Sequence, residues 1–501
     1  MNNRCLLTIL LVGMSLSACA PFEHYRTNLT EVFECTVDHD SVTETLALCE
    51  DRGSTNTHAI QHRHYTGNFV YEGAEDIPDK GDYYLSFVEF DDQGWFAERK
   101  QMDALFDLLN KLKEEDRETL IYVYAHGWKH NASSCDNNVV CFSRLLERTD
   151  IAEQKLLESK RTVVGVYLGW RGLPYKAGAL TNLSFWSRKD AAARVGSGGV
   201  LELLVRLNDY RNSRQTGETI DPRMTQLVIM GHSFGGLVIY SALSHALMER
   251  AAQTPYSAGV AELEVAKGFG DLVMLVNPAF EGSLYEPLFQ IATNRCYVAQ
   301  QRPVMMIVTS EADNATGTAF PIGRTLDTLF QHAMTREQRQ SMRKAIGHDD
   351  RYLTHELRSD GPKQQEVGDE SDCPCPFLEA TSKWSQTDLM ERFKSIIDVA
   401  IASRVPENES SMHKIKRYGG DVELTRNRDS MYASNYPYLV VKTDGGVISD
   451  HNAIYSNRFI NFVQQFFMQH IAWNPPLPLP GHENTQPGIK GQSCSEPTQK
   501  N

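Results

Sequence analysis

The stretch QLVIMGHSFGGLVIYSAL, residues 226–243, decides the fold of this 501-residue chain. The run QLVIM is typical of a buried strand, and GGLVIYSALSHALMER is typical of a helix, so Ser233 lies at a sharp turn between them. Gly-x-Ser-x-Gly by itself is a weak signal, because 34 glycines make roughly 0.15 chance matches per chain. The strand-turn-helix context is informative, because Gly231 and Gly235 relieve side-chain clashes at a strained corner and the helix directs its N-terminal dipole at the serine.

This corner resembles the nucleophile elbow of the α/β-hydrolase superfamily of serine esterases, lipases and related enzymes. The resemblance implies that Ser233 is the nucleophile and that an acid and a histidine follow it in that order. Asp313 follows the apolar run PVMMIVTS and occupies the family's acid position, with Glu311 and Glu281 as competitors. Further on, His451 occupies the position of the catalytic histidine, in a turn after the last strand run. The runner-up, His348 in IGHDD, is expected to be a surface residue of an insertion.

The oxyanion donors are also implied by the resemblance. In YVYAHGWKHN the triplet His126-Gly127-Trp128 ends a strand run, and the residue after this His-Gly supplies a backbone N–H in many α/β-hydrolases. The second donor is the backbone N–H of Phe234. Trp128 departs from the glycine-rich form of lipases and esterases, and His126 is expected to be a structural histidine below the site. These groups fit acyl chemistry, because an imidazole must take the serine proton, a carboxylate must hold its tautomer, and the N–H groups stabilise the oxyanion.

Short apolar runs alternate with longer amphipathic ones from residue 82 onward. Several runs are continuous in Val, Ile and Leu, as in strands buried on both faces. We therefore predict an α/β fold of the α/β-hydrolase type, with a mostly parallel central sheet, helices on both faces and a long insertion before the last strand. The predicted strands are residues 83–90, 119–127, 162–170, 226–231, 271–278, 303–310 and 438–443, and the predicted helices are 97–113, 190–210, 235–250 and 453–470.

The domain boundaries follow from changes in composition. The hydrolase core is predicted over 81–320 and 437–473, interrupted by a charged insertion at 321–436 that is either a lid or cap over the site or a peripheral addition. Residues 19–80 are expected to be a polar, irregular N-terminal arm, and 474–501 a proline-rich extended tail.

The N-terminus, MNNRCLLTILLVGMSLSACA, has the layout of a secretory signal whose apolar run is too short to span a bilayer. Its end, Leu16-Ser17-Ala18-Cys19, resembles the bacterial lipobox, which implies a signal peptide at 1–18 and a lipid anchor on Cys19. The alternative is an ordinary signal peptide cut nearby. Ala20 after the cysteine favours the outer membrane, so the expected location is the cell envelope of a bacterium, with the membrane as a partner.

The remaining cysteines suit an oxidising compartment. Two pairs are close enough for local disulfides, Cys35 with Cys49 and Cys135 with Cys141. No metal and no cofactor is predicted, because CPCP at 373–376 does not match zinc-ligand spacing and the histidines of HAIQHRHY are better explained as surface residues. The formal net charge of −14 and the absence of a basic stripe argue against a nucleic-acid partner.

The resulting functional hypothesis is a lipid-anchored serine hydrolase that cleaves carboxylic esters through an acyl-enzyme on Ser233. Acyl transfer and amide hydrolysis use the same triad and stay open, and the rival outside enzymology is a catalytically silent envelope interaction protein. Trp170, Phe185 and Trp186 could line an acyl site, although buried aromatics more often belong to the core.

Overall fold

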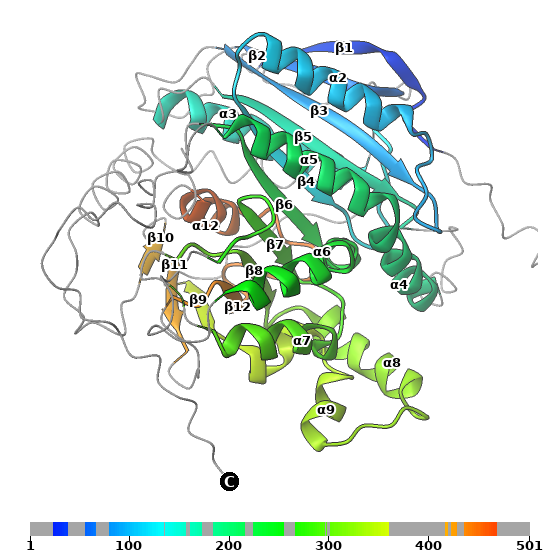
Figure 1. Ribbon diagram of the computed structural model, residues 1–501, viewed down its shortest axis with the longest axis vertical. Helices are drawn as coiled ribbons and strands as arrows, with labels where there is room; N and C mark the ends of the chain where they lie inside the picture. The colour runs from blue at the N-terminus through cyan, green and yellow to red at the C-terminus, as the bar shows by residue number, and fades with distance from the viewer. Residues whose placement is uncertain are drawn as a thin grey trace, which may run out of the picture.

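The structure is a computed structural model that describes residues 24–38, 56–66, 80–134, 136–156, 161–172, 184–215, 224–254, 266–295, 297, 301–359, 416–418, 422–427 and 435–467. It contains a twelve-stranded sheet with the order β1-β2-β3-β5-β4-β6-β7-β8-β12-β9-β11-β10 (Figure 1). The strands are β1 Asn28–Asp38, β2 His58–Thr66, β3 Lys80–Phe90, β4 Thr119–Ala125, β5 Thr162–Trp170, β6 Gln226–His232, β7 Leu272–Val276, β8 Met305–Ser310, β9 His355–Ser359, β10 Lys416–Tyr418, β11 Val422–Arg426 and β12 Tyr438–Thr443.

The centre of the sheet is parallel. Strands β3, β5, β4, β6, β7, β8, β12 and β9 all run the same way, whereas β2 is antiparallel to β3 and β11 is antiparallel to both of its neighbours. All seven predicted strands are present, and the predicted fold class is confirmed. Because parallel strands share one carboxyl edge, the loops after β4, β6, β7, β8 and β12 meet there.

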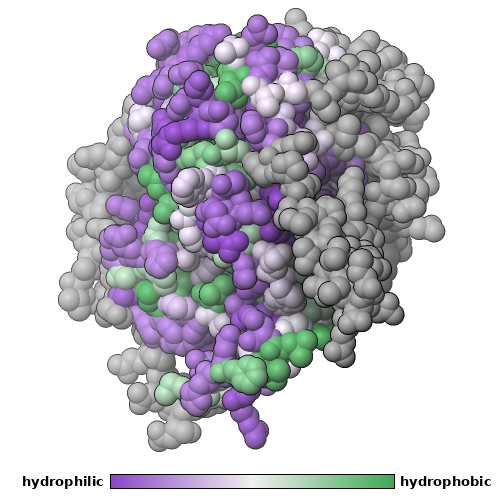
Figure 2. All heavy atoms as spheres, turned by 90° about the vertical axis from the view of Figure 1, so that its right-hand side faces the viewer, coloured by the Kyte–Doolittle hydropathy of each residue, from purple (hydrophilic) through white to green (hydrophobic). Residues whose placement is uncertain are grey.

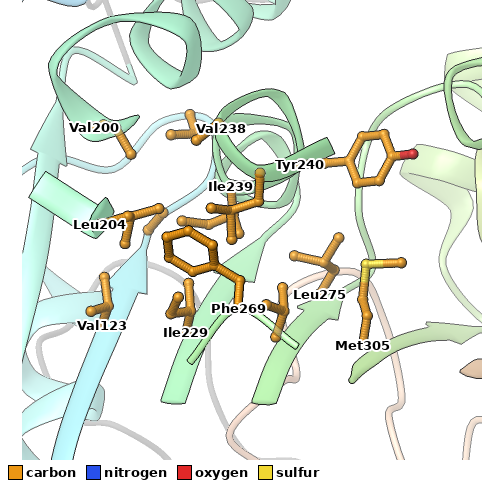
Figure 3. Packing of buried hydrophobic residues seen from close by; sticks show 14 of the residues in the cluster. Val123, Val200, Leu204, Ile229, Val238, Ile239, Tyr240, Phe269, Leu275 and Met305 are labelled. Carbon is orange, nitrogen blue, oxygen red and sulfur yellow. The ribbon is translucent and has the colours of Figure 1, made fainter. Parts of the chain in front are cut away.

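Helices cover both faces of the sheet, and each face has its own core. Alternate residues of β4 illustrate this, because Ile121 and Val123 pack with α2, α5 and α6, whereas Tyr122 and Tyr124 pack with α3 and α12. Figure 3 shows the first of these cores, with Ile239 of α6 directed toward Ile229 of the sheet and Val238 of α6 beside Val200. The helices are α2 Lys100–Glu114, α3 Asn137–Leu156, α4 Ser184–Val195, α5 Leu201–Arg214, α6 Phe234–Gln253, α7 Gly282–Thr293, α8 Phe320–Asp327, α9 Arg336–Ser341 and α12 Asn457–Phe467.

Two expectations about local structure are wrong. The N-terminal arm is not irregular, because β1 and β2 extend the sheet beyond β3, and their mixture of polar and apolar residues hides them from a search for apolar runs. The helix expected over 190–210 is broken at Gly196–Val200, where Gly198 has φ −101° and ψ −131°. A Cβ on Gly198 would lie 2.4 Å from the backbone oxygen of Gly94, so the close approach of the loop before α2 explains the break.

The described part of the insertion belongs to the sheet and its surroundings. β9 pairs with β12, and β11 and β10 follow it at the edge. The backbone N–H of Ile346 donates to the Phe280 oxygen at 3.0 Å, which ties residues 336–350 to the loop after β7. A lid or cap role for the rest of 321–436 lies outside the described residues.

The predicted covalent features are only partly covered. Cys35 and Cys141 are disulfide-bonded, but their expected partners Cys49 and Cys135 lie outside the described residues, so the pairing stays a prediction. Cys19, the signal peptide at 1–18 and the tail at 474–501 also lie outside them. Within the described part of the chain, none of the helices has the length and apolar character needed to cross a membrane.

Candidate active site

Ser233 lies at the corner between β6 and α6 in a strained conformation, with φ 55° and ψ −120°. Its N–H donates to the Val276 oxygen at 3.0 Å, and its own carbonyl accepts from Gly236 and Ala279 at 3.0 Å each, so the corner is held from three sides. A Cβ on Gly235 would lie 1.9 Å from the oxygen of Ala125. Glycine is therefore required there for α6 to begin directly beside β4.

Ser233, His451 and Asp313 form one continuous hydrogen-bonded chain. Ser233 Oγ lies 2.8 Å from His451 Nε2, and His451 Nδ1 lies 2.8 Å from Asp313 Oδ2. A carboxylate only accepts, so the proton of the neutral imidazole is on Nδ1 and Nε2 accepts from the serine hydroxyl. The structure thus brings together the three residues predicted as nucleophile, base and acid. Ser233 and Asp313 are buried, whereas the side chain of His451 is 20% exposed.

Asp313 has donors besides the histidine. The backbone N–H of Thr316 donates to Oδ1 at 3.0 Å, and the Thr316 hydroxyl donates to Oδ2. Burial alone would raise the pKa of this carboxyl, but the hydrogen bond and charge of His451, together with the two Thr316 donors, hold the pKa of Asp313 below its usual value of 3.8. The acid therefore stays ionised although it is buried.

The backbone of His451 is fixed by two side chains from neighbouring strands. His232 Nε2 and Asn277 Nδ2 each lie 2.9 Å from the His451 carbonyl oxygen and donate to it. Asn277 also accepts the N–H of Ser310 at 2.9 Å, so one amide connects the loops after β7, β8 and β12. Burial holds the pKa of His232 well below 6.5, so the ring is a neutral donor. His232 and Asn277 therefore position His451.

The loop after β4 lies against the nucleophile. A Cβ on Gly127 would be 2.9 Å from the Ser233 Cβ, so the backbone that leads from Gly127 into Trp128 lies next to Ser233. The N–H of Phe234 belongs to the first turn of α6, where no acceptor within the helix is available. Both predicted oxyanion donors are therefore on segments that flank Ser233, and their roles stay predictions.

His126 lies below this loop. It is fully buried, its Nε2 accepts the Trp170 N–H at 3.1 Å and its Nδ1 faces the Gly127 oxygen at 2.9 Å. Burial lowers the pKa of His126 to about 4, so it is a neutral structural histidine that shapes the loop.

A row of aromatic rings leads away from the serine. The Phe185 ring centroid lies 4.7 Å from that of Phe234 and 5.4 Å from that of Trp128, and Trp186 continues the row to Phe320 at 6.0 Å. Phe185 and Trp186 are half-buried and apolar, as the wall of an acyl site requires. Trp170, by contrast, is buried and stacks on the ring of His126 at 5.5 Å, so it belongs to the core.

The competing acids pair with basic side chains, and the competing histidine contacts Thr316. Glu281 forms ion pairs with Lys189 and Arg324 at 2.9 Å each, and Glu311 pairs with Arg358. The expectation that His348 is a surface residue is wrong. It is half-buried, its Nε2 lies 3.0 Å from the Thr316 hydroxyl, and burial lowers its pKa.

Sequence reasoning missed Thr316, Asn277 and the role of His232. His232 lies inside the GHSFG motif, and Asn277 ends an apolar strand run next to a proline, a position typical of functional polar residues in α/β sheets. Thr316 has no such signal, because a threonine three residues after an acid is common.

No protein-family model and no curated protein matches the chain. Among solved structures, the chain is similar to one described as phospholipase PlaB from Legionella pneumophila in complex with thio-NAD, with 12% sequence identity and a TM-score of 0.23. The similarity covers 49% of this chain and 47% of that one, so the chain matches about half of that protein's length. At this score the similarity identifies no family, and the function has to be argued from the geometry of the site.

Proposed function

We propose that this chain is a serine hydrolase that cleaves carboxylic esters. The observation that carries the proposal is the continuous chain from Ser233 Oγ through His451 to Asp313, with 2.8 Å at both links. Such a chain makes a hydroxyl nucleophilic at neutral pH, because the imidazole accepts its proton and the buried carboxylate stabilises the imidazolium.

The proposed reaction has two halves. Ser233 Oγ attacks the ester carbonyl carbon while its proton moves to His451 Nε2, and the oxyanion is stabilised by the N–H groups of Phe234 and Trp128. The C–O bond to the alcohol then breaks, and His451 returns the proton to the leaving alkoxide. A water molecule gives a proton to His451 and attacks the acyl carbon; the C–O bond to Ser233 Oγ then breaks, His451 returns the proton to Oγ, and the carboxylic acid leaves.

The surface beside the site favours an amphiphilic acyl ester. The segment 322–334 follows the catalytic acid and exposes large apolar side chains, with Phe330 fully exposed and Ile322 at 62%. Figure 2 shows hydrophobic residues at the lower end of one face, the end where Figure 1 has α8 and α9. Large apolar side chains that gather on a surface mark an interaction site. The aromatic row from Trp128 to Phe320 connects α8 with the serine, so an acyl chain could follow it inward.

The location is part of the proposal. A lipid on Cys19 would hold the enzyme at the envelope membrane of a bacterium, where acylated amphiphiles are concentrated. Metabolic labelling of the protein with palmitate in cells, compared between the wild type and Cys19→Ser, tests this separately from the chemistry. Equal labelling of the two proteins would contradict the anchor.

A fluorophosphonate probe tests the nucleophile. We expect the wild type to be labelled and Ser233→Ala to be unlabelled, because the probe reacts only with an activated serine. Ser244→Ala, on the same helix and away from the triad, is the matched control and should be labelled like the wild type. Labelling of Ser233→Ala at the wild-type level would overturn the proposal.

Nitrophenyl esters of increasing chain length test the substrate class. We expect a preference for long chains that weakens in Phe330→Ser, while Leu201→Ser, an exposed apolar residue of α5, should keep the preference. Turnover of amides or acyl transfer to an added alcohol would identify the alternative uses of the triad. No turnover of any ester, together with no probe labelling, would favour the silent envelope interaction protein.

A further inference from the structure

The strands β1, β2 and β3 carry a cluster of metal-ligand side chains on one face. In the register, Glu34 of β1 pairs with His62 of β2, which pairs with Tyr84 of β3, and His64 pairs with Asp82. Residues paired across strands and residues two apart along a strand point to the same face. His62 and His64 therefore stand side by side, with Glu34 on one flank and Asp82 on the other.

The distances within the cluster are short. Oxygen Oε2 of Glu34 lies 3.0 Å from His62 Nδ1 and 2.8 Å from His64 Nε2, and one ligand atom from each of the three residues fits within 4.8 Å. In a tetrahedral zinc site the ligand atoms are about 3.3 Å apart, so these atoms need to separate by roughly 0.4 Å to admit the ion. All three residues are half-buried or exposed, which leaves the long side chain of Glu34 free to make that adjustment.

We propose that Glu34, His62 and His64 bind a divalent transition-metal ion, Zn²⁺ in the first instance. Two imidazoles and one carboxylate are a ligand set that zinc prefers over the harder Mg²⁺ and Ca²⁺. The three protein ligands leave a fourth position for water, because the Glu34 side chain is 62% exposed.

A second layer of contacts already orients one ligand. His62 Nε2 lies 2.9 Å from Asp82 Oδ2 and donates to it, so Nδ1 is directed at Glu34 and gives up its proton when the ion binds. A carboxylate behind a histidine is the usual support of a zinc ligand. Tyr84 adds to this, because its ring stacks on His62 at 4.1 Å with an 8° interplanar angle. Arg117 pairs with Asp82, at 3.8 Å between Nη2 and Oδ2.

The site is separate from the candidate active site. β2 and β6 are four strand spacings apart in the sheet, roughly 19 Å. An ion held by β1 and β2 would cross-link the N-terminal strand, which is the edge of the sheet, to its neighbour. The expected consequence is a metal-dependent gain in stability without a requirement for metal in ester hydrolysis.

Calorimetric titration of the chelator-treated full-length chain with Zn²⁺ tests the proposal. We expect one ion per chain with micromolar or tighter affinity, an affinity at least tenfold weaker in His64→Gln and Glu34→Gln, and about tenfold weaker in Asp82→Asn. His332→Gln removes an exposed histidine outside the cluster and should bind like the wild type. Co²⁺ in place of Zn²⁺ should give the intense visible absorption of a four-coordinate ion.

Three results would overturn the proposal. They are no saturable binding to the wild type below 100 µM Zn²⁺, a Zn²⁺ affinity of His64→Gln equal to that of the wild type, or a loss of Zn²⁺ affinity in His332→Gln as large as that in His64→Gln. Since Glu34 is largely exposed, Glu34→Gln should keep the melting temperature of the metal-free wild type, and only the rise caused by Zn²⁺ should disappear. Ser233→Ala should bind the ion normally, so this outcome does not depend on the catalytic proposal.

Discussion

Replacing Thr316 by valine tests how the buried acid is kept ionised. Thr316 does not face the serine, but its hydroxyl donates to Asp313 Oδ2 and its N–H donates to Oδ1 at 3.0 Å. Valine keeps the size and the N–H and removes only the hydroxyl. The perturbation therefore takes one of the carboxylate's three donors and leaves the bond to His451 in place.

The size of the effect follows from burial. A hydrogen bond to a buried charge contributes about 1.5–3 kcal/mol, and Thr316 and Asp313 are both 1% exposed, so solvent cannot replace it. His348 also loses the acceptor of its Nε2–H, which lies 3.0 Å from the Thr316 oxygen. We therefore expect the free energy of unfolding to fall by about 3 kcal/mol. If half of this loss raises the activation free energy of the step in which the imidazolium forms, kcat/KM at neutral pH falls about tenfold.

The assay is ester hydrolysis as a function of pH, with urea denaturation alongside. The pKa of Asp313 is below 3.8 in the wild type and should rise in Thr316→Val, so the acidic limb of the stability profile, which ends near the pKa of the folded state, should end at higher pH. KM should stay unchanged, because Thr316 does not touch the substrate. The matched control is Thr325→Val, whose hydroxyl donates to the Pro321 carbonyl within α8 and should affect neither limb.

The reasoning would be refuted by a Thr316→Val enzyme with kcat/KM within twofold of the wild type and an unmoved acidic limb. A loss of stability alone would mean that the hydroxyl supports the loop and not the ionised state of the acid.

Three further perturbations have definite signs. Gly235→Ala puts a Cβ 1.9 Å from a backbone oxygen of β4, and we expect a large loss of folded protein, measured by yield and thermal melting. Asn277→Ala removes one of two donors to the carbonyl of the catalytic histidine, and kcat should fall about tenfold at constant KM in steady-state kinetics. From pH 6.5 down to 4.5, stability should fall by about 1.4 kcal/mol per pH unit or more in urea denaturation. Burial lowers the pKa of His126 to about 4 and that of His232 well below 6.5, so two protons bind only the unfolded chain, and the lowered pKa of His348 adds to this loss. Burial raises the pKa of Asp150 to about 7, so one proton binds only the folded chain and offsets one histidine.

Each of these has a matched control. Gly268→Ala, where a Cβ meets only ordinary contacts at 3.4 Å, should fold normally, and equal melting of Gly235→Ala would contradict the packing argument. Asn294→Ala, an exposed amide on α7's last turn, should keep wild-type kcat. Asp150→Asn should steepen the acid slope by about 1.4 kcal/mol per pH unit, since the offset is removed, and an unchanged slope would show that this carboxyl ionises normally.

Local patterns predicted a large part of the fold. Seven strands were predicted from apolar runs, because strands buried on both faces must be apolar throughout. The same rule missed β1 and β2, where His62 and His64 face outward and Arg63 between them is buried under α3 with its guanidinium bonded to Ser143. A buried arginine has no recognisable sequence pattern, because the hydrogen bonds that offset the desolvation of its guanidinium come in part from residues distant in sequence.

The sequence by itself determined that Ser233 lies at a strand-turn-helix corner and predicted an acid and a histidine after it, because glycines, apolar strand runs and the turn are local features. Tertiary structure alone decided that Ser233 and His451, separated by 218 positions, come within 2.8 Å. It also decided that Asn277 and Thr316 hold the triad and that Glu34 meets two histidines. The reason is physical: strand order and register set which loops share the carboxyl edge of the sheet, and contacts across strands leave no mark on the residues next to them in sequence.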